Sequence, residues 1–260
     1  MKILSLNVNG EKLNNVDSIN KMMEICDVEL YCFQESKYEL HKGARINTVN
    51  YFKKENKVFQ KNSDVYKNIW DRSFFWLEYP ENYIAESEIS LKSSTFILIN
   101  VHLAGFYSGK RYPLMSTLLE RLEKVDLKKK NVILLGDFNA QDADNTKSKC
   151  LVEGSKYLNG LKDKGFNELF MEKEKSPIAT YIDRSNNAFR YDHVFVRLKE
   201  DSKIKVSIER YFPESTTDND NKGWYSDHRG IVIEILERDY SDKSEFIEKI
   251  AHRKYNILTL

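Results

Sequence analysis

The residues whose types and spacing could carry chemistry gather where apolar segments end. Asp137 and Asn139 lie in a Gly-Asp-Phe-Asn segment that follows the apolar run 132–135. Positions two apart in an extended chain face the same side, so this carboxylate and this amide would point together. Such a pair can hold a water molecule, a metal ion or a phosphate oxygen. An ordinary Asp-x-Asn turn is the alternative interpretation of the tetrapeptide alone.

Further carboxylates and imidazoles occupy similar positions. Glu35 ends a predicted strand, and its carboxylate is a hard oxygen ligand of the kind that Mg²⁺ prefers. Asp227 and His228 precede the last predicted strand, and Asp192 is a candidate to orient the His228 imidazole and keep it charged. His102 ends another strand. Each of these residues alone also fits a solvated strand end or a packed histidine.

The sequence lacks the marks of other hydrolytic chemistries. It has no Gly-x-Ser-x-Gly elbow, no glycine-rich phosphate loop and no zinc-ligand spacing. His193 is left out of the chemistry as a packed histidine. The remaining carboxylates, amides and imidazoles are the groups that metal-assisted attack of water on a phosphate ester requires.

Apolar runs and helical spacing alternate along the chain, which predicts an α/β fold or a sheet sandwich with helices outside. The predicted strands cover residues 3–8, 28–33, 72–79, 95–103, 132–135, 194–198, 204–208 and 231–235. Helical spacing appears over 16–26, over 114–125 after Pro113, and over 242–253. The candidate polar residues fall at strand ends, where rigid strands support loops that reach solvent.

Composition limits the setting more than the function. The 260 residues are 41% apolar, enough for one large domain with a substantial core. Lys and Arg number 41 against 40 Asp and Glu, so the chain has no overall excess of positive charge for binding nucleic acid. A chain that is neutral overall can still have a local basic groove. No apolar run nears the ~18 residues of a membrane span. With three cysteines and no secretory signal, we expect a cytoplasmic monomer without membrane contact.

Six short motifs, in their order and rough spacing, resemble those of the endonuclease/exonuclease/phosphatase superfamily. They are Leu-Asn-Val-Asn-Gly at 6–10, Gln-Glu at 34–35, Asn-Val-His at 100–102, Gly-Asp-Phe-Asn at 136–139, Arg-Tyr-Asp at 190–192 and Ser-Asp-His at 226–228. The resemblance implies a four-layered α/β sandwich, with two central mixed β-sheets and helices on the outside. It also implies a catalytic domain over 1–236, and the remaining 237–260 would form a C-terminal helical extension.

The resemblance also implies a metal site for Mg²⁺ or Mn²⁺. Glu35 matches the principal metal ligand of the superfamily, with Asn7 and Asn9 beside it. Asp227 matches a nearby carboxylate of the metal site.

The remaining matched residues would carry the catalytic steps. Asp137 resembles the residue that activates or orients the attacking water, and Asn139 the amide that positions the water and the phosphate. Asp192 matches the carboxylate that orients the final histidine, His228, which would contact a phosphoryl oxygen. His102 resembles the phosphate-contacting histidine of the deoxyribonuclease I and phosphatase branches.

Local likeness points to two DNA-processing branches. Residues 7–10 and 34–37 look like exonuclease III-type abasic-site endonucleases, which carry Tyr at the position of His102. Residues 189–197 and 226–230 look closer to the tyrosyl-DNA phosphodiesterase 2 type, although the Arg that follows the Gly-Asp-Phe-Asn motif there is missing here.

The first hypothesis is therefore a metal-dependent phosphodiesterase that acts on DNA. Lys110 and Arg111 could grip a phosphate, or simply begin a basic helix. Phe189, Trp224 and Tyr225 could stack on a base, or pack in the core. A phosphatase of a small soluble or lipid phosphate is the second hypothesis, because the same site would serve it. A non-catalytic binding module is the third.

Overall fold

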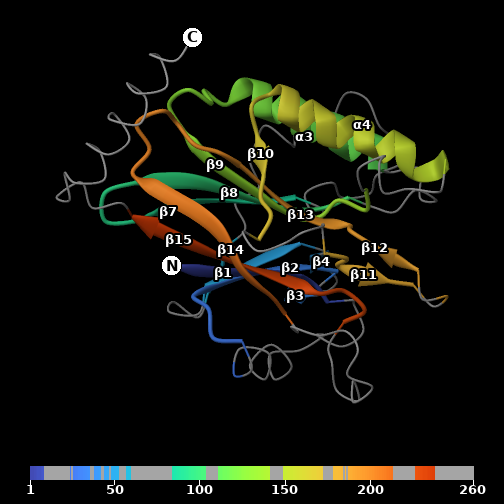
Figure 1. The fold of residues 1–260 in the computed structure, drawn as a ribbon. Helices are drawn as coiled ribbons and strands as arrows, with labels where there is room; N and C mark the ends of the chain where they lie inside the picture. Colours follow the sequence, from blue (N-terminus) through green and yellow to red (C-terminus); the bar gives the residue numbers. More distant parts are fainter. Residues whose placement is uncertain are drawn as a thin grey trace, which may run out of the picture.

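The described residues fold into two large β-sheets packed face to face, and two helices among them cover the outer face of one sheet (Figure 1). The structure is a computed structural model. It describes residues 1–8, 24, 26–35, 38–41, 44–46, 48–52, 57–59, 84–103, 111–140, 149–171, 178–183, 185, 187–212 and 226–237. This is the predicted α/β sandwich with two central mixed sheets. The predicted strand 72–79 lies outside the described residues, as do nearly all of the predicted helix 16–26 and the extension 237–260.

The six-stranded sheet has the order β14-β15-β1-β2-β5-β6. At its centre, β1 runs parallel to β2 and antiparallel to β15. The strands are β1 (Lys2–Asn7), β2 (Leu30–Gln34), β5 (Val49–Phe52), β6 (Lys57–Phe59), β14 (Ile204–Phe212) and β15 (Gly230–Glu237). The parallel pair ends at Asn7 and Gln34, so Asn7 and Glu35 emerge at the same edge of this sheet.

The five-stranded sheet has the order β10-β13-β9-β8-β7. Its strands are β7 (Ile84–Ser90), β8 (Thr95–His102), β9 (Asn131–Asp137), β10 (Asn167–Glu168) and β13 (Asp192–Arg197). Strands β8 and β9 are parallel, and His102 pairs with Asp137 at their ends. Two-stranded ribbons complete the described strands: β3 (Tyr38–His41) with β4 (Ala44–Ile46), and β11 (Tyr181–Ile182) with β12 (Ala188–Phe189).

Strand β9 separates two hydrophobic cores. Leu134 packs under helices α3 (Arg111–Lys124) and α4 (Lys149–Asp163), in a cluster with Leu118 and Leu158. Its neighbour Leu135 points into the space between the two sheets. A strand buried on both faces needs an unbroken apolar run, which is why 132–135 carries no polar residue. No helix within the described segments is long and apolar enough to span a membrane.

Candidate active site

Asn7 joins the two sheets at the edge where their parallel strands end. Its Nδ2 donates hydrogen bonds to Glu35 Oε1 at 3.1 Å and to Asp137 Oδ2 at 2.9 Å. Glu35 follows β2 in the six-stranded sheet, and Asp137 ends β9 in the five-stranded sheet. One buried amide therefore holds together two carboxylates from different sheets.

Glu35, His102 and Asp137 form a group with the spacing of a cation site. His102 Nε2 lies 3.4 Å from Glu35 Oε1 and 3.8 Å from Asp137 Oδ2. One ligand atom from each residue lies within 4.8 Å of the others. The backbone of Glu35 has a φ of 54°, in the left-handed region that few residues other than glycine adopt, so its side chain is aimed by an uncommon conformation. Two converging carboxylates suit the oxygen preference of Mg²⁺ or Mn²⁺.

The turn after β9 fixes the Asp137 carboxylate. The Asn139 backbone N–H donates to Asp137 Oδ1 at 2.7 Å. Its side-chain Nδ2 donates to Asp137 Oδ2 at 3.0 Å and to the Leu103 carbonyl at 2.7 Å. Asn139 achieves this with a φ of 48°. The predicted side-by-side placement of this carboxylate and this amide is therefore present in the structure.

Gly136 is required where β8 and β9 approach each other. Its φ is 132°, and a Cβ atom built there would lie 2.0 Å from the backbone oxygen of Val101. No side chain fits at that distance. The glycine thus lets the two strand ends close until His102 and Asp137 lie side by side.

Asp137 places a titratable carboxyl group in a buried environment. Its exposed fraction is 1%, and burial raises the pKa of its carboxyl above the ordinary value. The nearby charge of Asp192 adds to this rise, whereas the imidazoles of His228 and His102 oppose it. A carboxylate with a raised pKa is a better proton acceptor near neutral pH.

Asp192 and His228 form a buried ion pair next to Asp137. His228 Nδ1 lies 2.8 Å from Asp192 Oδ2. Burial alone would lower the pKa of His228, but the hydrogen-bonded Asp192 carboxylate raises it to about 10. The hydroxyl of Thr180 accepts hydrogen bonds from the backbone N–H groups of Tyr191 and Asp192, both at 3.0 Å, and so fixes the start of β13.

Ser226 links the segment that carries His228 to Asn7. Its hydroxyl oxygen accepts a hydrogen bond from the His228 backbone N–H at 3.0 Å and donates one to the Asn7 carbonyl. His228 is therefore tied to the same residue that bridges Glu35 and Asp137.

Aromatic rings extend the site beyond His228. Tyr181 lies against the His228 ring at 4.8 Å between centroids and stacks on Tyr191 at 5.4 Å. Phe189 stacks on Tyr191 at 5.1 Å. These three rings are partly exposed, so they form a half-open aromatic surface beside the polar centre.

The structure brings together most of the site residues predicted from sequence. Those that meet at the strand ends are Asn7, Glu35, His102, Asp137, Asn139, Asp192 and His228. Asp227 has an exposed side chain, whose charge helps raise the pKa of His228. Arg111 begins α3, but its side chain lies outside the description, as do the whole of Asn9, Lys110, Trp224 and Tyr225.

Sequence reasoning gave no role to Thr180, Tyr181 and Tyr191. Thr180 and Tyr181 lie in a segment without a strong pattern, and a bridge between Tyr181 and His228 brings it to the site. Tyr191 lies in the Arg-Tyr-Asp motif, which was the available signal.

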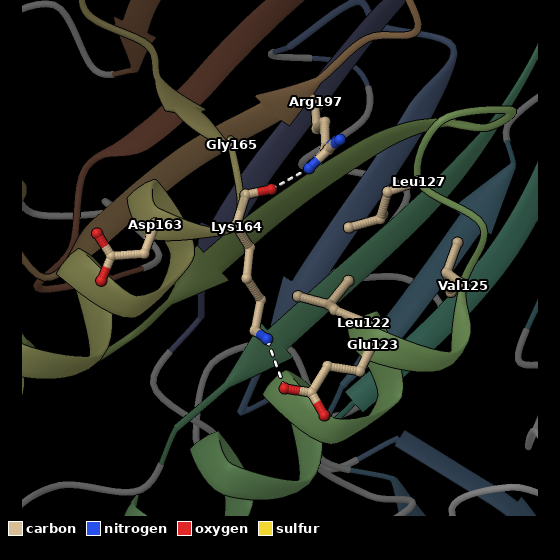
Figure 2. Close-up of a pocket in the computed structure, with 8 residues that line it drawn as sticks. All are labelled: Leu122, Glu123, Val125, Leu127, Asp163, Lys164, Gly165 and Arg197. Carbon is tan, nitrogen blue, oxygen red and sulfur yellow. Dashed lines mark hydrogen bonds and ion pairs between the residues drawn. The ribbon is translucent and has the colours of Figure 1, made fainter.

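A cavity of about 350 Å³ lies at the opposite end of the five-stranded sheet (Figure 2). Arg197, which lines it, ends β13, whereas Asp192 begins this strand at the site. Figure 2 shows the Lys164 ammonium paired with Glu123 and the Arg197 guanidinium donating to the Lys164 carbonyl. The Lys164 Nζ and Glu123 Oε1 atoms are 2.7 Å apart. These charged groups connect the ends of α3, α4 and β13 to one another.

Comparison with solved structures identifies the fold. A 3'-5' exonuclease (NExo) from Neisseria meningitidis has a TM-score of 0.60 and 16% identity, over 90% of this chain and 99% of its own. An AP endonuclease from Archaeoglobus fulgidus has a TM-score of 0.58 and 14% identity, over 90% and 98%. TDP2 from D. rerio, complexed with a single-strand DNA product, has a TM-score of 0.55 and 14% identity, over 91% and 98%.

The chain thus has the fold of the endonuclease/exonuclease/phosphatase superfamily, as its motifs predict. Neither a scan against protein-family models nor a search of curated proteins finds a match.

Proposed function

We propose that this chain is a divalent-metal-dependent phosphodiesterase that hydrolyses phosphoester bonds in DNA. The observation that carries the proposal is the joining of Glu35 and Asp137 by Asn7, with the Asp192–His228 ion pair beside them. This set combines a cation site, a proton acceptor and a charged donor, which phosphoester hydrolysis needs together.

Glu35 and Asn7 would hold the ion, and Asn9 and Asp227 are further candidates. The oxygen-rich donor set fits Mg²⁺ or Mn²⁺, and the approach of Glu35 to Asp137 leaves negative charge for a cation to offset. When bound, the ion supplies Lewis-acid stabilisation of the charge that develops on the leaving oxygen.

Asp137 would orient the attacking water and accept its proton. Its two oxygens are already held by Asn7 and Asn139, so its direction is fixed before substrate arrives. The raised pKa of its carboxyl favours proton transfer near neutral pH. Asn139 would place the water and a phosphate oxygen through its amide.

His228 would donate to a phosphoryl oxygen. Asp192 holds the ring through Nδ1, and Nε2 of the imidazolium is the donor in this proposal. The raised pKa of His228 keeps the ring charged at neutral pH, as stabilisation of an anionic transition state requires. His102 would make a similar contact from the other side of Asp137.

The aromatic surface favours DNA over a small phosphate. Phe189, Tyr181 and Tyr191 present partly exposed rings next to His228, where a sugar or base adjoining the phosphate would lie. Stacking of a base on such a ring contributes about 1–3 kcal/mol. Further proposed substrate contacts are Arg111, whose side chain the structure does not describe, and Lys110, Trp224 and Tyr225, which lie outside the described residues.

A substrate panel tests the proposal. Plasmid DNA, an abasic duplex, a 5′-tyrosyl oligonucleotide, RNA and inositol phosphates are incubated with Mg²⁺, with Mn²⁺ and with EDTA. We expect a DNA substrate to be cut with either metal and left intact with EDTA. If only inositol phosphates are hydrolysed, the proposed substrate becomes a small phosphate ester instead of DNA. If no substrate is hydrolysed, the enzyme assignment is contradicted.

A further inference from the structure

A buried hydrogen-bonded chain lies behind the turn that carries Asp137 and Asn139. Neighbouring residues of a strand point to opposite faces, so Asp192 faces the catalytic centre and His193 faces the helix-covered core. There the His193 ring packs edge-on against Phe138, with 5.5 Å between ring centroids. Its exposed fraction is 1%, so its polar atoms need partners inside the protein.

Both ring nitrogens of His193 have an oxygen partner. Nε2 lies 2.7 Å from the carbonyl oxygen of Ala140, and Nδ1 lies 2.7 Å from Glu168 Oε1. A carbonyl can only accept, so Nε2 donates to Ala140. The acid at the other end is equally buried, with a side-chain exposure of 2%.

Glu168 is the anchor of this chain. Burial alone would raise the pKa of its carboxyl, but His193, Arg190 and Lys162 together lower it below the ordinary value. Glu168 is therefore an anionic partner for Nδ1. The His193 ring thus links the sheet edge at Glu168 to the catalytic turn at Ala140.

The turn needs such an anchor because its conformation is uncommon. Asn139 immediately precedes Ala140 and has a φ of 48°, which costs free energy for a residue with a side chain. Other hydrogen bonds hold the turn up to Asn139, among them Phe138 N–H to the Tyr191 carbonyl at 2.8 Å and Asn139 Nδ2 to the Leu103 carbonyl at 2.7 Å. The bond from His193 holds the turn on the far side of Asn139, at Ala140.

We propose that His193 is a positioning residue that acts through the Ala140 carbonyl to keep Asn139 and Asp137 in their catalytic arrangement. The inference deepens the proposed function and depends on it for its catalytic part. His193 touches neither substrate nor metal in this proposal. Its effect is to hold the amide and carboxylate within the narrow tolerance that catalysis requires, since misplacement by about 1 Å can lower a rate about 100-fold.

Two variants and a matched control test the inference. His193→Phe keeps a ring next to Phe138 and removes both hydrogen bonds. Glu168→Gln keeps an acceptor for Nδ1 and is the conservative variant. The control is Asn131→Ala, because Asn131 is also buried and ties backbone groups of the same sheet, at the end away from the site.

The first measurement is hydrogen exchange over residues 136–140 in the metal-free protein, which needs no activity. We expect His193→Phe to speed exchange there about 10-fold or more under conditions where the protein stays folded. Glu168→Gln should show a smaller increase. The control should change exchange near residue 131 and leave 136–140 unchanged.

The second measurement is steady-state kinetics on the substrate found by the panel. We expect His193→Phe to lower kcat about 10- to 100-fold with KM within about threefold, and Glu168→Gln to keep most of kcat. The control should keep kcat.

The outcomes separate this inference from the proposed function. Unchanged exchange over 136–140 in both site variants, or an equal loss of kcat in the control, would overturn the role of His193. If exchange is faster in His193→Phe and the wild-type protein cuts none of the substrates, the result would support the anchor and overturn the proposed function. If His193→Phe does not fold, hydrogen exchange in Glu168→Gln decides: faster exchange over 136–140 than in the wild type supports the anchor, and unchanged exchange overturns it.

Discussion

Asp137 and Asp192 lie directly opposite each other on β9 and β13, and both side chains are almost fully buried. Their hydrogen-bond partners separate their functions. Asp137 accepts from two asparagine side chains, whereas Asp192 pairs with the His228 imidazole. In the proposed function, Asp137 faces the attacking water and the cation, whereas Asp192 holds the positive charge of His228 in place.

Asp192 sets the charge of His228, so Asp192→Asn should lower the pKa of His228 from about 10 to its ordinary value or below. The reason is that burial alone lowers this pKa once the carboxylate is absent. An NMR titration of the histidines in the metal-free protein measures the shift. Asp183→Asn is the control, because Asp183 bonds to its own loop, and it should leave the pKa of His228 unchanged.

The Asp192–His228 pair also makes stability depend on pH. The unfolded chain loses the His228 proton near pH 6.5, whereas the folded protein keeps it up to about pH 10. The stabilisation is therefore complete below pH 6.5 and disappears as the pH rises toward 10. Urea unfolding of the metal-free protein should show a loss of roughly 2–4 kcal/mol between pH 6.5 and 9.

His228→Gln supplies the comparison for that measurement. Burial also raises the pKa values of the Cys26 and Cys32 thiols and of Tyr31, so these groups lower the free energy of unfolding at alkaline pH in both proteins. The difference between wild type and His228→Gln isolates the histidine. Equal pH slopes in the two proteins would contradict the ion pair.

Glu35→Gln should abolish turnover and weaken Mg²⁺ binding at least 10-fold, because it removes the charged oxygen that we assign to the metal. Its side chain is 37% exposed, so we expect the free energy of unfolding to change by less than about 1 kcal/mol. Calorimetric titration with Mg²⁺ and urea unfolding measure the two effects. Glu29→Gln, at the other end of β2, should change neither turnover nor binding, and full activity in Glu35→Gln would refute the metal assignment.

The strand ends could be predicted from sequence because each polar residue of the site follows or precedes a clear apolar run. Leu134 and Leu135 mark a strand buried on both faces, and Asp137 is the first charged residue after them. The motif order then placed Glu35 and His228 in the same site, although no local pattern brings the two sheets together.

Other features depend on contacts that local patterns do not encode. Strands β3 to β6 lie in the polar, aromatic-rich region after residue 37, where no clear periodicity predicts them. Tyr181 reaches the site through an isolated bridge to His228. His193 resembles any packed histidine in sequence, and its two oxygen partners come from segments far from it in the chain.

Gly136 gives the most direct test of how the strand ends create the site. Gly136→Ala would place a Cβ atom 2.0 Å from the Val101 backbone oxygen at a φ of 132°, so β8 and β9 must separate. We expect a loss of about 3 kcal/mol or more in unfolding free energy, and a lower kcat in the protein that remains folded. Gly160→Ala in α4 is the matched control, because the added Cβ atom would lie 3.6 Å from the Leu119 side chain; the variant should be more stable by up to about 1 kcal/mol and keep activity. Equal stability of the two variants would contradict the close approach of β8 to β9.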